Sequence, residues 1–147
     1  MTKDVLVSVS SFQTAQNETE RMEVINKGNY YKKNDFHYVV YEEMMEGFDR
    51  PIKSRMKFKE GELTVTKKGL LNVNMIFEEN KKNSCCYATP YGDMMLGIDT
   101  TQVELIEEED RIFVNAFYSL EANYEHLADC EIHMEICSKD LGMQITS

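Results

Sequence analysis

The alternation of apolar and polar residues at every second position limits the fold of this sequence more than any other feature. Residues 130–136 read Cys-Glu-Ile-His-Met-Glu-Ile, and residues 51–59 place Ile52, Met56 and Phe58 between basic residues. A period of two turns one set of side chains toward a core and the other toward solvent, as in a β-strand. No segment has a convincing helical period, and a short helical turn near residues 124–127 is the only helix that we consider.

Further alternating segments follow one another along the chain, separated by short turn signals such as Asn-Asp, Glu-Gly and Lys-Gly. They cover residues 5–9, 63–66, 71–77, 94–98 and 112–120, and another turn is expected at residues 47–51. Long strands joined by tight hairpins favour closure over a Greek-key sandwich, because closure removes unpaired strand edges. We therefore predict an all-β fold, a single antiparallel up-and-down barrel of about 8–10 strands with little helix. Residues 1–147 are expected to form one domain.

The charge balance and the cysteines bear on partners and compartment. The formal net charge is −10, and an acidic surface repels both nucleic-acid phosphates and anionic lipid. Binding to nucleic acid would then need a concentrated basic patch, so we expect neither nucleic acid nor membrane as a partner. The first residues do not resemble a signal peptide, and no apolar run is long enough for a membrane helix. These features predict a cytoplasmic protein with reduced thiols.

No constellation of residues predicts catalysis, a metal or a cofactor. His126, Cys130, His133 and Cys137 lie close together in the sequence. Alternation along a strand turns Cys130 to one face and His133 to the other, so the four side chains cannot converge on zinc. The sequence also lacks a nucleophile elbow, a P-loop and a dinucleotide-binding fingerprint. We expect no enzyme, and thiols that behave as small apolar side chains.

Two outward surfaces are candidates for interaction. Lys53, Arg55 and Lys57, continued by Lys59, form a basic stripe on alternate positions of one strand. A solvated face paired with Glu residues of neighbouring strands is the favoured interpretation, and docking of an acidic partner is the alternative. Phe113 and Phe117 lie opposite the apolar set of residues 112–120. Exposed Phe side chains indicate a surface that is covered by a packed terminal segment or by another subunit, and self-association is the favoured interpretation.

The barrel interior is open to two interpretations. Tyr and Met residues could line a small amphipathic cavity, or they could fill the core, which is the favoured interpretation. Pro90 and Gly92 predict a bend between two strands, since proline removes a backbone donor and glycine permits unusual dihedral angles. If a pocket has a mouth, we expect Tyr87, Thr89 and Tyr91 beside it.

Several segments, in this order, resemble one known family. They are Tyr38-Val39-Val40-Tyr41-Glu42-Glu43, Met56-Lys57-Phe58, Val65-Thr66-Lys67-Lys68-Gly69, Met75-Ile76-Phe77, Tyr87-Ala88-Thr89-Pro90-Tyr91-Gly92 and Ile98-Asp99-Thr100. The chain resembles the YwiB-like bacterial proteins of unknown function over residues 5–136. The resemblance implies a calycin-like, or lipocalin-like, β-barrel and supplies no function. Calycin barrels often hold small apolar ligands, which is an analogy from fold alone.

Two hypotheses for function follow. The first is a non-catalytic binding module for a small amphipathic molecule or peptide, with Tyr87, Thr89 and Tyr91 near its opening. The second is a structural or protein-interaction barrel with a filled core, which acts through the basic stripe or through the Phe113 and Phe117 face.

Overall fold

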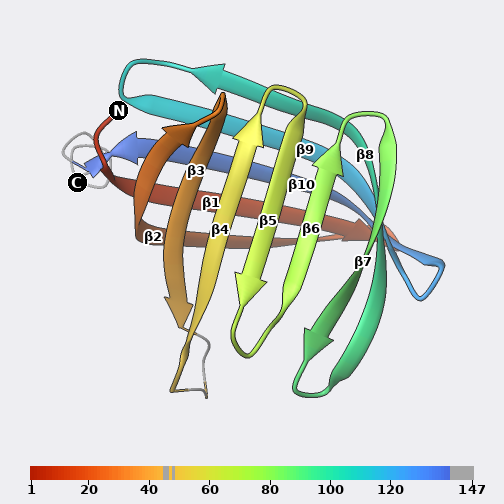
Figure 1. The fold of residues 1–147 in the computed structure, drawn as a ribbon. Helices are drawn as coiled ribbons and strands as arrows, with labels where there is room; N and C mark the ends of the chain where they lie inside the picture. The colour runs from red at the N-terminus through yellow and green to blue at the C-terminus, as the bar shows by residue number, and fades with distance from the viewer. Residues whose placement is uncertain (45–46, 48, 140–147) are drawn as a thin grey trace.

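Ten strands account for nearly the whole of the computed structural model, which describes residues 1–44, 47 and 49–139. The turn expected at residues 47–51 includes Phe48, which lies outside the described residues. The strands, shown in Figure 1, are β1 (Asp4–Ala15), β2 (Glu18–Lys33), β3 (Phe36–Met44), β4 (Pro51–Lys59), β5 (Glu62–Lys68), β6 (Val73–Glu78), β7 (Lys81–Thr89), β8 (Gly92–Glu107), β9 (Arg111–Ala122) and β10 (Glu125–Ser138).

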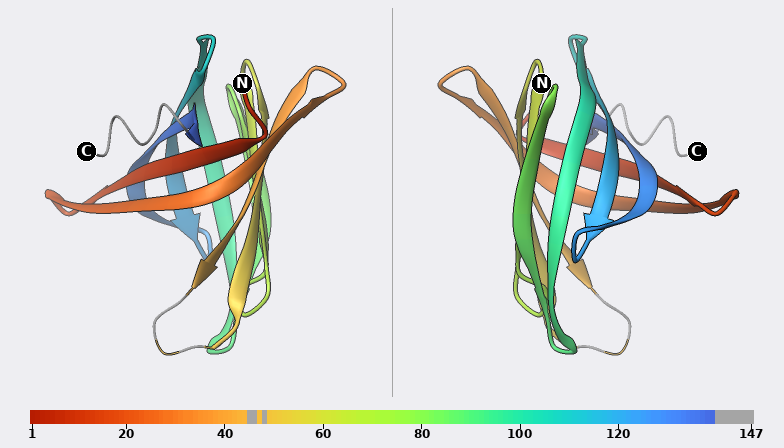
Figure 2. Two further views of the ribbon diagram at one scale, coloured as in Figure 1. Left: turned by 90° about the vertical axis from the view of Figure 1, so that its left-hand side faces the viewer. Right: turned by 90° about the vertical axis from the view of Figure 1, so that its right-hand side faces the viewer.

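The strands pair as a meander in which the first and last strands are neighbours. The order in the sheet is β6-β5-β4-β3-β2-β1-β10-β9-β8-β7, and every pair of neighbours is antiparallel. Figure 2 shows the sheet curling so that β2–β6 face the layer of β1, β10, β9 and β8. The predicted all-β, antiparallel up-and-down barrel of about ten strands is therefore confirmed.

Only the seam between β6 and β7 lacks a continuous ladder. Asn72 and Ala88 exchange two backbone hydrogen bonds of 3.0 Å, and Asn80 donates its N–H to the carbonyl of Thr100 at 2.9 Å. The backbone N–H of Val103 reaches the carboxylate of Glu79 at 3.0 Å. These few bonds bring the two ends of the sheet together, so the barrel is nearly closed.

Side chains from both layers fill the barrel interior. The ring of Phe77 on β6 packs edge-on against Tyr118 on β9, with the ring centroids 4.7 Å apart. Alternate residues along β3, β4, β9 and β10 are buried, as the sequence pattern predicts. The largest fully buried side chains are Phe58, Phe77, Ile52, Leu63, Ile98, Met134 and Ile136. A contiguous apolar core of this kind is the main stabilising contribution to the fold.

Two sequence-based expectations about local structure were incomplete or wrong. The helical turn near residues 124–127 is instead the β9–β10 hairpin, in which Asn123 and Tyr124 have φ angles of 50° and 69°. Residues 18–33 form the long strand β2, which the alternating sequence pattern did not predict. No helix in the described part of the chain is long and apolar enough to cross a membrane.

Candidate functional site

The outer face of strands β2–β5 carries a regular grid of polar and aromatic side chains. Cross-strand partners form three rows over this face, because the four strands pair in continuous register. The first row runs Glu42, Lys53, Lys68; the second runs Asn29, Val40, Arg55, Thr66; the third runs Tyr31, Tyr38, Lys57, Thr64. The basic stripe of β4 therefore lies between neighbours that the sequence alone could not assign.

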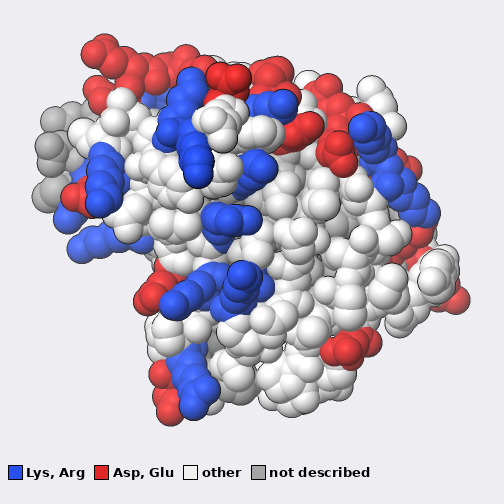
Figure 3. Space-filling model, viewed as in Figure 1, with Lys and Arg blue, Asp and Glu red and all other residues white. Residues whose placement is uncertain are grey.

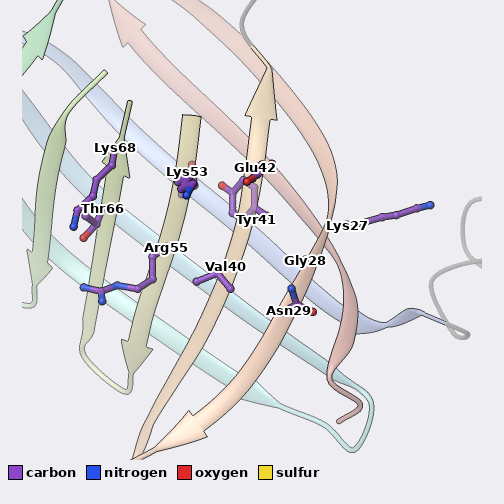
Figure 4. Close-up of a pocket in the computed structure, with 11 residues that line it drawn as sticks. Lys27, Gly28, Asn29, Val40, Tyr41, Glu42, Lys53, Arg55, Thr66 and Lys68 are labelled. Atoms are coloured by element: carbon purple, nitrogen blue, oxygen red, sulfur yellow. The ribbon is translucent and has the colours of Figure 1, made fainter. Parts of the chain in front are cut away.

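A groove of about 600 Å³ opens on this face. β2 pairs with β3 only from Gly28 to Lys33, whereas it pairs with β1 from Glu18 to Asn29. Beyond Gly28 the two ribbons diverge, and the groove lies beside this point of divergence. Its lining, shown in Figure 4, consists of Lys27, Gly28, Asn29, Val40, Tyr41, Glu42, Lys53, Ser54, Arg55, Thr66 and Lys68.

The cations of the groove have no ionic partners among the described residues. Lys53, Arg55 and Lys68 are exposed, and no carboxylate of the described chain lies within 4.0 Å of their charged nitrogens. Figure 4 shows Arg55 extending toward β5, whereas Lys27 points away from the other labelled side chains. Figure 3 shows basic side chains gathered over this face, with acidic ones along the upper edge. The register places Glu42 opposite Lys53 and Glu62 opposite Lys59, as the favoured expectation requires, but neither pair is within ion-pair distance among the described residues.

Aromatic rings adjoin the basic groove on the same outer face. The ammonium groups of Lys57 and Lys59 lie 4.2 and 4.7 Å from the centre of the Phe36 ring, within the range of cation–π attraction. The rings of Tyr31 and Tyr38 stack with a centroid distance of 4.8 Å and an interplanar angle of 5°. Tyr31 is still 44% exposed. The face therefore combines cations with an accessible aromatic platform.

The three residues expected at a pocket mouth are not brought together. The hydroxyl of Thr89 donates to the carbonyl of Gly92 at 2.7 Å and accepts from the N–H of Tyr91 at 3.1 Å, so Thr89 closes the β7–β8 turn. The side chain of Tyr91 is 89% exposed. Tyr87, like Thr89, is part-buried, and burial together with the charge of Glu43 raises the pKa of the Tyr87 phenol. Thr89 and Tyr91 thus shape a turn, as the Pro-Tyr-Gly bend predicts.

Glu43 belongs to a polar cluster on the inner face of β3–β5. Its carboxylate accepts a hydrogen bond from the ammonium of Lys67 at 3.0 Å and one from the hydroxyl of Ser54 at 3.4 Å. Burial, followed by the charge of Glu43, raises the pKa of Tyr41 above its ordinary value. The adjacent Glu42 faces outward into the groove, so the two carboxylates point apart as strand alternation requires.

Phe113 and Phe117 lie on the outer face of β9, far along the sheet from the groove. The imidazole of His133 on β10 contacts the ring of Phe117 and also that of Phe12 on β1, each with centroids 5.7 Å apart. His133 thus covers part of Phe117, and both Phe113 and Phe117 are half-buried. Self-association through this face stays a prediction.

The cysteines are distributed as strand alternation predicts. Cys130 points into the core, where burial raises the pKa of its thiol, while His133 lies on the outer face. Cys85 is part-buried and its neighbour Cys86 is exposed, and both are free thiols. Over the described ranges, no group of three or more His, Cys, Asp and Glu side chains is arranged to hold a metal ion.

A buried histidine at the end of β3 has both ring nitrogens occupied. His37 is 3% exposed and stacks on Phe58 with a centroid distance of 5.1 Å. Its Nδ1 lies 2.7 Å from the hydroxyl of Tyr30, and its Nε2 contacts the carboxylate of Glu107. Burial lowers the pKa of His37, Lys32 lowers it further, and Glu107 opposes the shift. The imidazole is therefore neutral at physiological pH, with Nε2–H donating to Glu107 and Tyr30 donating to Nδ1.

This histidine makes stability depend on pH in a defined direction. The pKa of His37 is lower in the folded chain than its ordinary value of 6.5, so the unfolded chain takes up the proton first. We expect its contribution to the free energy of unfolding to be complete above pH 6.5 and to be lost as the pH falls below it. Urea unfolding between about pH 7.5 and pH 5.5 measures the slope. The variant His37→Gln should flatten the slope, while the exposed control His126→Gln should leave it intact; equal slopes in all three proteins would contradict the assignment.

The fold and the site together define a nearly closed antiparallel β-barrel with a basic groove on its outer wall. Residues 7–134 match the family described as "Domain of unknown function (DUF1934)", and the chain belongs to that family. The crystal structure of the ywiB protein from Bacillus subtilis superimposes with a TM-score of 0.73 at 22% identity, covering 90% of this chain and 91% of that one. The expected YwiB-like resemblance is thus confirmed, and at this identity it establishes the fold alone. No curated protein has a matching sequence.

Proposed function

We propose that this chain is a non-catalytic binding module that takes an anionic ligand in the basic groove of β2–β5. One observation carries the proposal: in a chain of net charge −10, exposed cations without ionic partners among the described residues line a groove of about 600 Å³. Charge-assisted hydrogen bonds from Lys and Arg to phosphate or carboxylate are strong, and those from Arg are geometrically specific. The groove also offers Asn29 and Thr66 as neutral partners for such an anion.

The filled barrel core favours a ligand in the outer groove over a ligand inside the barrel. Fully buried Phe58, Phe77 and Ile98 occupy the space that a small amphipathic molecule would need. The basic groove lies mainly on the outer wall, and so does a second concave region whose lining includes Phe12, Phe117 and Glu131. The interior-ligand hypothesis and the relation to calycin barrels stay predictions. A cytoplasmic location is likewise proposed, and the four free thiols suit a reducing compartment.

Binding of inorganic polyphosphate, measured by isothermal titration calorimetry at low salt, tests the groove directly. We expect the double variant Lys53→Gln, Arg55→Gln to bind at least about tenfold more weakly than the parent, because two charge-assisted contacts are lost. Raising the salt concentration should weaken the parent's binding as well.

A matched control removes one Lys and one Arg elsewhere. Lys3→Gln, Arg21→Gln changes the net charge equally but leaves the groove intact, since Arg21 pairs with Glu23 on the distant part of β2. Its affinity should stay within about twofold of the parent's. If both double variants weaken binding equally, the effect is one of net charge, and the groove is not the site.

A further inference from the structure

The aromatic platform beside the groove has no role in binding a simple anion. Tyr31 and Tyr38 are direct cross-strand partners, and Tyr38 in turn faces Lys57 across the β3–β4 pair. The stacked rings thus continue the row that begins at the basic stripe, on the same outer surface. A ligand that follows β4 and crosses Tyr38 toward β2 would contact the cations and the exposed ring of Tyr31 together.

This combination matches the chemistry of single-stranded nucleic acid. Proteins that bind single strands pair a positively charged groove for the backbone with aromatic rings on which bases stack. Outward side chains on β4 recur about every 6.8 Å along the strand, a distance comparable with the spacing of phosphates in an extended single strand. Lys53, Arg55 and Lys57 occupy three successive outward positions at that spacing.

The surroundings favour a short single strand over other polyanions. An acidic peptide would satisfy the cations but would leave the exposed Tyr31 ring without a partner. A duplex hides its base faces and would extend over the acidic edge that Figure 3 shows above this face. The sequence alone led us to expect no nucleic acid unless a concentrated basic patch existed, and the register of β3–β5 creates such a patch.

We propose that the outer face of β2–β5 binds single-stranded nucleic acid, with phosphates at Lys53, Arg55 and Lys57 and a base stacked on Tyr31. The inference rests on the proposed function, because it uses the same groove. It adds the ligand class and a residue, Tyr31, that a plain anion site does not require.

Fluorescence anisotropy with a labelled oligothymidylate of about ten nucleotides tests the inference. The second probe is an abasic oligonucleotide of equal length and charge, and the third is poly-glutamate. Tyr31→Leu should bind the oligothymidylate about five- to tenfold more weakly than the parent and should bind the abasic probe unchanged. Tyr31→Phe should keep full affinity, because stacking uses the ring and not the hydroxyl. Tyr91→Leu, which changes an exposed tyrosine on the β7–β8 turn, should have no effect.

The outcomes separate this inference from the proposed function. Preference for the oligothymidylate over the abasic probe, lost in Tyr31→Leu, supports the inference. Equal affinity for the two probes, insensitive to Tyr31 but sensitive to Lys53→Gln, Arg55→Gln, overturns it and leaves a general anion groove. Binding of poly-glutamate alone overturns it in favour of an acidic protein partner. If the groove variant binds all three probes as the parent does, both proposals fail. Thermal unfolding of each variant verifies that the fold is retained.

Discussion

Replacing Phe77 with alanine is expected to lower the free energy of unfolding by about 3–5 kcal/mol. Phe77 is fully buried and packs against Tyr118 from the opposite layer of the barrel. It belongs to β6, one of the two strands at the open seam, where few backbone hydrogen bonds assist closure. The loss is a large fraction of the about 5–15 kcal/mol that stabilises a typical domain. Urea unfolding followed by circular dichroism measures it.

Phe113→Ala is the matched control, because it removes the same ring from the outer wall. Phe113 lies half-buried on the outward side of β9, so its truncation leaves no cavity inside the barrel. We expect a loss of about 1–2 kcal/mol, clearly smaller than for Phe77. Comparable losses at the two positions would mean that the inward and outward assignment of the strands is wrong.

Gly28→Ala is expected to destabilise the chain by about 1–3 kcal/mol through overpacking. A Cβ at this position would lie 2.9 Å from the backbone oxygen of Val40 and 3.2 Å from a methyl of Val7. The Val40 oxygen is a backbone atom and cannot move without shifting β3, and the Val7 methyl belongs to a fully buried side chain. Gly28 also lines the groove where β2 leaves β3, so the variant should weaken polyphosphate binding too.

The control for this prediction is Gly97→Ala. Its added Cβ would also meet an atom at 2.9 Å, but that atom is the carboxylate end of Glu121, which can rotate away. The variant disturbs at most the exposed ion pair between Glu121 and Lys82, and such pairs contribute little. We expect a change within about 1 kcal/mol. Equal destabilisation by both substitutions would show that close backbone approach at Gly28 is not the cause.

The barrel was predictable because alternation identifies strands whose two faces differ in environment. On β4, Ile52, Met56 and Phe58 point inward while the basic residues point outward, as the sequence pattern indicates. β2 gave no such signal, since its first half pairs only with β1 in a projecting hairpin and is exposed on both faces. A strand without a buried face has no reason to alternate.

The candidate site was predictable only in part. The stripe on β4 was visible, but Lys68, Asn29 and the groove itself depend on the register between strands that lie far apart in the sequence. The register between strands also determines which of the two adjacent carboxylates, Glu42 or Glu43, forms an ion pair with a lysine. Glu43, rather than its exposed neighbour, binds a lysine, and it does so inside the barrel.

The tyrosines expected at a pocket mouth show why composition could not locate a site. Tyr87, Thr89 and Tyr91 stand at every second position, which strand alternation alone would turn to one face, but the β7–β8 turn engages the hydroxyl of Thr89 and leaves Tyr91 exposed. Tyr31 was not predicted as a site residue, because it lies on β2, a strand that the sequence pattern did not indicate. Its partner Tyr38 is contributed by β3 through a hairpin register that only the fold reveals.

Backbone amide chemical shifts of the isotopically labelled protein, followed by NMR during titration with inorganic polyphosphate, test the groove most directly. We expect the shift changes to centre on Asn29, Val40, Arg55 and Thr66, which share one row across β2–β5. Residues of the β9–β10 wall, such as Phe113 and His133, should remain unaffected. Changes concentrated on that wall, or spread evenly over the surface, would contradict the assignment of the outer face of β2–β5 as the binding site.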